Sequence, residues 1–154
     1  MSNENKKFND IGLKCLGERL KEDLECLLYP GKDWVPQRNE VTDIVIIGGG
    51  MCGMVSWLAL SSGGIKNIRI FDRAPKGKEG PWLNYARMET LRSPKNLTGP
   101  AFGLGALTFQ AWYRAQHGED AWEKLHRIPR PMWMDYLQWY RGILEIPIEN
   151  GVSV

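Results

Sequence analysis

The spacing of apolar positions changes along the chain, and each spacing predicts a different element. Between residues 13 and 28, leucines recur at every third or fourth position, which predicts an amphipathic helix that Pro30 and Gly31 end. Residues 43–47 (DIVII) are, after Asp43, a run of Val and Ile without polar alternation, as expected for a parallel strand with both faces covered by helices. Residues 1–10 are polar, and we expect them to be frayed.

The elements after this first strand complete a βαβ unit. Residues 51–60 are compatible with a helix that the run Ser-Ser-Gly-Gly ends, and residues 65–71 (IKNIRIF) predict a second strand. Strand, glycine turn, helix and strand then follow one another within about thirty residues, which predicts two parallel strands joined by a right-handed crossover. The fold class is therefore α/β, with a parallel sheet of the Rossmann type.

The pattern changes after the second strand. Residues 73–106 contain five glycines and four prolines without clear periodicity, which predicts a long loop. The next regular segments are helical, over residues 108–117, 119–125 and 132–144. In the last helix one face carries Trp133, Tyr136, Leu137, Tyr140 and Leu144, which we expect in the core. Residues 146–154 can begin a further strand, so we predict an incomplete sheet with a helical insertion after the second strand.

Composition narrows the class of protein. The 154 residues, 43% hydrophobic and 25% charged, suffice for one globular domain. A net charge of +2 without long basic runs gives no case for a nucleic-acid partner. No apolar stretch reaches the roughly 20 residues that cross a bilayer, so we predict no membrane partner and a cytoplasmic location. Cys15, Cys26 and Cys52 form no C-x-x-C pair, and we predict neither a disulfide framework nor a metal site.

The candidate chemistry lies in the stretch TDIVIIGGGMCGM, where Gly48, Gly50 and Gly53 match the pattern G-x-G-x-x-G. Each glycine has a separate steric reason in a dinucleotide site. The first permits the tight turn out of the strand, the second lets the pyrophosphate approach the backbone, and the third lets the helix lie close to the strand. The N-terminus of the helix offers free N–H groups to the phosphates. The alternative is a tight turn that binds no ligand.

An acidic residue at the end of the second strand strengthens this interpretation. Asp72 follows Gly53 by nineteen residues, at the position where a carboxylate accepts hydrogen bonds from the ribose hydroxyls. A carboxylate here argues against a cofactor with a 2′-phosphate, which leaves FAD or NAD. The alternative for Asp72 is a solvated or capping residue at the strand end.

The same residues carry a resemblance to a known family. The run DIVIIGGGMCGMVSWLALSSGG, followed by IRIFDRAP, resembles the FAD-binding start of flavoproteins of the FAD/NAD(P)-binding superfamily. The stretch EGPWLNYARMETLRSPKNLTGPAFGLGALTFQAWYRAQHG resembles the segment that follows in flavin-dependent monooxygenases that N-hydroxylate lysine and ornithine. The resemblance implies a Rossmann-like FAD-binding domain over residues 41–154, partial in extent, after an N-terminal extension over residues 1–40 that contains the amphipathic helix.

The resemblance implies an enzyme in which NADPH reduces FAD and the reduced flavin uses oxygen to hydroxylate a substrate. Trp82, Met88 and Arg92 lie where the family folds a loop against the flavin, with packing or solvent exposure as the alternative role. No catalytic residue is predicted. The predicted cofactor-binding residues are Gly48, Gly49, Gly50, Met51, Cys52, Gly53, Asp72, Arg73, Trp82, Met88 and Arg92.

Two features depart from the family pattern. Trp57 occupies a position where family helices commonly have a small residue, and its bulk must find room against the sheet. No second glycine fingerprint with a strand before it follows residue 53, so we expect an N-terminal piece, inactive alone, whose NADPH site lies in the missing part or in a downstream polypeptide.

Two other functions stay open. An NAD-dependent dehydrogenase would use the same fingerprint, but it predicts a compact helix directly after the second strand, which residues 73–106 do not provide. A non-catalytic nucleotide-binding or partner-docking module is favoured by the N-terminal helix.

Overall fold

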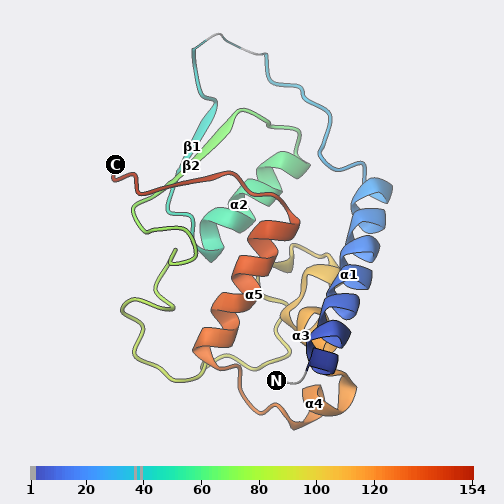
Figure 1. Ribbon diagram of the computed structural model, residues 1–154. Coiled ribbons are helices and arrows are strands. Elements are labelled where there is room, and N and C mark those ends of the chain that lie inside the picture. The colour runs from blue at the N-terminus through green and yellow to red at the C-terminus, as the bar shows by residue number, and fades with distance from the viewer. Residues whose placement is uncertain (1–2, 37, 39) are drawn as a thin grey trace.

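The computed structural model describes residues 3–36, 38 and 40–154, and it has an open three-stranded sheet with its helices gathered on one side (Figure 1). The strands are β1 (Ile44–Ile47), β2 (Ile68–Asp72) and β3 (Ile148–Asn150). They lie in the order β1-β2-β3, and both pairs are parallel, with Ile44 opposite Ile68 and Ile70 opposite Ile148. The predicted α/β fold with an incomplete parallel sheet is confirmed.

The crossover between β1 and β2 is α2 (Met51–Ser62). The helix ends at its glycines, since the Gly63 N–H donates to the Ala59 carbonyl at 3.0 Å and Gly64 takes a φ of +85°. Trp57 is half-buried and packs against the core, so its bulk is accommodated. The predicted βαβ unit is present, with α2 ending slightly later than the sequence pattern suggested.

A helical insertion separates β2 from β3, as predicted. After an irregular segment the chain forms two 3₁₀ turns, η1 (Gly99–Ala101) and η2 (Gly105–Leu107). The helices α3 (Phe109–His117), α4 (Glu119–Lys124) and α5 (Arg130–Ile143) follow. Thr108 caps α3, because its Oγ1 accepts the Ala111 N–H at 3.1 Å. Pro131 lies in the first turn of α5, where a helix needs no N–H.

The centre of the core is the apolar face of α5. Tyr136 and Tyr140 are fully buried, and their hydroxyls donate to the carbonyls of Leu107 (2.6 Å) and Pro100 (2.9 Å). These bonds attach α5 to the two 3₁₀ turns. Burial raises the pKa of both tyrosines well above the ordinary value. The prediction that this face of the helix is core is confirmed for all five residues that defined it: Trp133, Tyr136, Leu137, Tyr140 and Leu144.

The N-terminal helix α1 (Asn3–Cys26) lies along α3 and joins the same core. Leu16 and Leu20 are buried there, and a Cβ at Gly12 would stand 1.7 Å from the Ala115 carbonyl oxygen. The helix begins earlier than its leucine stripe, so the prediction of frayed residues is wrong from Asn3 onward; residues 1 and 2 lie outside the described part. Glu and Lys are good helix formers, which lets a helix extend beyond its apolar stripe.

The two faces of the sheet differ. Ile46 and Ile70 face the helices, whereas Val45 and Ile47 are 49% and 68% exposed on the opposite face. The prediction that both faces of β1 are covered by helices is therefore wrong in the described chain. An unbroken Val/Ile run is compatible with two covered faces, but it does not tell which elements are present to cover them. Among the described residues, no helix has the length and apolar character that crossing a bilayer requires.

Candidate functional site

The glycine turn leaves β1 at Gly48 and enters α2 at Met51. Gly48 has a φ of +103°, a conformation that glycine adopts without strain. A Cβ at Gly53 would stand 1.9 Å from the Gly48 carbonyl oxygen, so the start of α2 lies directly against the turn. Gly48 therefore makes the predicted tight turn, and Gly53 permits the predicted close approach of the helix.

Gly50 differs from its neighbours because the fold itself leaves room for a side chain there. Its backbone is extended, with φ −70° and ψ −173°, and the atom nearest to an added Cβ would be the Gly80 Cα at 3.4 Å, an ordinary van der Waals distance. The first helical hydrogen bond runs from the Met54 N–H to the Gly50 carbonyl, so the preceding N–H groups have no partner within the helix. Together with the helix dipole, they form a site suited to an anion.

Asp72 joins the end of β2 to this turn. Its side chain is buried, with Oδ2 accepting the Gly49 N–H at 2.7 Å and Oδ1 accepting the Ala74 N–H at 2.7 Å. Both carboxylate oxygens retain a further lone pair for a ligand hydroxyl. Gly49 lies beneath the turn, where a Cβ would meet the Ile148 side chain at 2.6 Å. The sequence motif gave no signal that Gly49 holds Asp72 in place.

A cleft of about 1100 Å³ brings most of the predicted residues together. Gly49 is buried and does not line it, and Met88 and Arg92 are exposed and lie outside its lining. The cleft also contains residues that sequence reasoning missed, among them Ser56, Gly80 and Tyr85. The predicted residues that line it are Gly48, Gly50, Met51, Cys52, Gly53, Asp72, Arg73 and Trp82.

Trp82 provides a further observation on what this cleft can hold. Its indole Nε1 is buried and has no hydrogen-bond partner among the residues that the structure describes. The ring contacts Trp133 edge-on, with 6.1 Å between centroids, and lies beside Gly80. A buried donor without a partner is costly unless a ligand atom accepts from it. A dinucleotide fits the groups that meet here: the uncovered backbone of Gly50, the N-terminus of α2, the carboxylate of Asp72 and the indole N–H of Trp82.

Sequence reasoning also missed Glu79, which precedes the glycine that faces Gly50. It is 4% exposed, and its carboxylate pairs with Arg141 of α5. The sequence shows a charged residue directly before the Gly-Pro-Trp run, but it does not show that this residue is buried. The burial of Glu79 depends on α5 and β3, which are distant in sequence.

Comparisons with known proteins agree with this geometry. Residues 45–154 match the FAD-NAD(P)-binding family. The chain is 43% identical over 148 residues to the FAD-dependent urate hydroxylase of Xanthomonas campestris pv. campestris, and the match covers 94% of this chain and 31% of that enzyme. The chain thus spans about a third of the length of this curated relative. No solved structure matches it.

Proposed function

This chain belongs to the FAD-NAD(P)-binding family, and from that premise we propose that it is the FAD-binding part of a flavin-dependent hydroxylase. FAD is the cofactor that both the family and the relative support. The observation that carries the proposal is the cleft in which the uncovered backbone of Gly50 and the carboxylate of Asp72 meet.

The predicted residues that line the cleft each have a proposed role toward the dinucleotide. The glycine turn and the N–H groups at the start of α2 hold the pyrophosphate, because they combine free donors with the positive end of the helix dipole. Asp72 accepts from the ribose hydroxyls through the lone pairs that Gly49 and Ala74 leave free. Trp82 donates its indole N–H and forms one wall. Met51, Cys52 and Arg73 contact the cofactor from the rim.

Met88 and Arg92 are proposed to contact a different part of the cofactor. They lie outside the cleft lining, on the exposed segment that follows Trp82. Their proposed role is toward the flavin ring, beyond the pyrophosphate. The proposed boundary between this domain and the N-terminal extension lies near residue 40.

The activity of the whole enzyme is proposed as hydroxylation that depends on NADPH. Bound FAD supplies the redox chemistry, while the residues of this chain bind and orient it and exclude water from it. The relative is named for acting on urate, so we propose urate as the first substrate to test, ahead of lysine and ornithine. The NADPH and substrate sites are proposed to lie in a further polypeptide segment, and the chain alone is proposed to be inactive.

The purified 154-residue chain, incubated with FAD or with NAD and passed through gel filtration, tests the proposal. We expect flavin absorbance to co-elute with the protein after incubation with FAD, and no nicotinamide to co-elute after incubation with NAD. Retention of NAD in place of FAD would favour the dehydrogenase alternative. A folded chain that retains neither would contradict the proposed cofactor site.

A further inference from the structure

The loop over residues 79–82, here called the Gly80 loop, crosses directly over the glycine turn. A Cβ on Gly50 would stand 3.4 Å from the Gly80 Cα, and Gly80 itself takes a φ of +72°. Gly80 and Trp82 line the dinucleotide cleft together with Gly50. The position of this loop therefore sets the width of the cleft where the pyrophosphate is proposed to lie.

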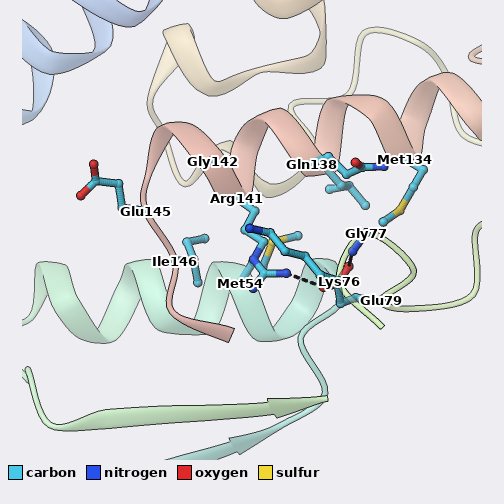
Figure 2. Close-up of a pocket in the computed structure, with 12 residues that line it drawn as sticks. Met54, Lys76, Gly77, Glu79, Met134, Gln138, Arg141, Gly142, Glu145 and Ile146 are labelled. Carbon is cyan, nitrogen blue, oxygen red and sulfur yellow. Dashed lines mark hydrogen bonds and ion pairs between the residues drawn. The ribbon is translucent and has the colours of Figure 1, made fainter. Parts of the chain in front are cut away.

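The first residue of the loop is attached to two distant elements. Glu79 Oε1 accepts from Arg141 Nη1 and, at 2.7 Å, from Asn150 Nδ2 of β3, while Glu79 Oε2 accepts the Gly77 N–H at 2.9 Å. A carboxylate that is 4% exposed thus has a charged and a neutral donor on one oxygen and a neutral donor on the other, as a buried charge requires. Figure 2 shows Arg141 extending from α5 toward Glu79 across the space above α2.

Arg141 and Asn150 are themselves held in place. Arg141 Nη1 donates to Asn150 Oδ1 at 3.0 Å, and Arg141 Nη2 donates to the Ile148 carbonyl at 2.9 Å. Asn150 Nδ2 also donates to the Ala74 carbonyl at 3.0 Å, two residues beyond Asp72. The guanidinium joins the loop to β3 through both of its terminal nitrogens, whereas a lysine would keep the charge but offer a single nitrogen.

The other end of the loop is attached to the same helix. Arg130, in the first turn of α5, donates from Nη1 to the Trp82 carbonyl. The two arginines stand near opposite ends of α5, which spans Arg130–Ile143. Because α5 is anchored in the core by Tyr136 and Tyr140, the loop is fixed to a rigid element at both ends.

We propose that Glu79, Arg141 and Asn150 are positioning residues for the cofactor, and that they hold the Gly80 loop against the glycine turn. This inference rests on the proposed FAD site. As far as the described residues define the cleft, none of the three lines it. Glu79 and Arg141 instead border an adjoining hollow of about 310 Å³ between α2 and α5, which Gly50 lines as well (Figure 2). They act on the cofactor through the loop.

The test compares two carboxylates that each pair with an arginine. Glu79→Gln removes the charge behind the Gly80 loop. Glu149→Gln removes a charge from the exposed sheet face, where Glu149 pairs with Arg69 at 2.7 Å, and serves as the matched control. Leu20→Val removes one buried methylene from the core at α1, away from α5 and the loop, and controls for a general loss of stability. Arg141→Lys, a milder change, keeps the test possible if Glu79→Gln folds poorly.

Two quantities are measured for each folded variant of the 154-residue chain, well below its melting temperature. The dissociation constant for FAD comes from the quenching of flavin fluorescence, and hydrogen exchange is followed in peptides over residues 77–85 without FAD. If the loop is seated in only a tenth of the molecules, affinity falls about tenfold. We expect this loss and faster exchange in Glu79→Gln, a smaller loss in Arg141→Lys, and neither effect in Glu149→Gln or Leu20→Val.

The outcomes separate the inference from the proposed function. If the unaltered chain binds FAD but Glu79→Gln binds it equally well, or if loop exchange is unchanged, the positioning role is overturned while the cofactor site stands. Equal losses in Leu20→Val and Glu79→Gln would overturn it as well, because a general loss of stability would then explain both. Failure of the unaltered chain to bind FAD would overturn the proposed function and this inference with it.

Discussion

Gly50 and Gly53 belong to the same glycine fingerprint, yet the structure requires glycine at only one of them. An added Cβ at Gly53 would collide with the Gly48 carbonyl oxygen at 1.9 Å, whereas at Gly50 it would meet its nearest neighbour at 3.4 Å. The fold therefore accounts for Gly53, and a ligand is needed to account for Gly50. This difference allows folding and binding to be tested separately.

Alanine at each position should separate the two roles. Gly53→Ala is expected to lower the free energy of unfolding by about 3 kcal/mol, because backbone must move to relieve the collision. Gly50→Ala is expected to cost less than about 1 kcal/mol, the usual effect at an N-cap position. Guanidinium denaturation followed by circular dichroism measures both. Equal losses would show that Gly50, too, is glycine for the sake of the fold.

At the residue scale, the sequence predicted the parts whose causes are local. Gly48 needs its positive φ because a strand turns sharply into a helix there. The need for this turn can be inferred because the strand, the glycines and the helix follow one another directly in the sequence. Glu79 could not be inferred, because its burial depends on Arg141 and Asn150, which the fold brings to it from far along the chain. Met88 and Arg92 were inferred from resemblance, and their roles stay predictions.

At the element scale, α5 links the core to the cleft. Its buried face carries Tyr136 and Tyr140, and its polar positions Arg130 and Arg141 hold the two ends of the Gly80 loop. The aromatic stripe was predictable from its helical spacing. The loop contacts were not, because an arginine on a helix has no sequence pattern that tells which loop it reaches. The early start of α1 was missed because only apolar positions were used to define the helix.

The buried tyrosines predict a loss of stability in alkaline solution. Burial raises the pKa of Tyr136 and Tyr140 in the folded chain, and that of half-buried Tyr29 as well, while the unfolded chain releases these protons near pH 10. Stability is then fully present below pH 10 and falls above it, by up to about 1.4 kcal/mol per pH unit for each tyrosine. Denaturation midpoints between pH 8 and 11 measure the slope.

Two phenylalanine variants check which groups cause that slope. Tyr140→Phe should make it shallower, although the variant is less stable at neutral pH because the Pro100 carbonyl loses its donor. Tyr136→Phe should make the slope shallower as well, because burial raises the pKa of Tyr136 too. A slope in Tyr140→Phe as steep as in the unaltered chain would contradict the assignment.

At the scale of the whole molecule, a three-stranded sheet with helices on one side presents the carboxyl ends of β1 and β2 to a single cleft. Parallel α/β sheets bind ligands at this edge. The sequence predicted this arrangement because the order of strand, helix and strand determines it. It did not predict the bare face of Val45 and Ile47, because a strand's composition does not reveal what covers it.

The most direct test of this account is the dissociation constant for FAD of the unaltered chain and of Gly50→Val, measured by quenching of flavin fluorescence. Gly105→Val is the control, since a Cβ at Gly105 meets nothing within 4 Å and Gly105 lies outside the cleft lining. We expect Gly50→Val, still folded, to bind FAD at least about tenfold more weakly, a loss of about 1.4 kcal/mol, and Gly105→Val to bind it normally. Equal affinity for FAD in the unaltered chain and Gly50→Val would contradict the claim that this glycine turn holds the cofactor.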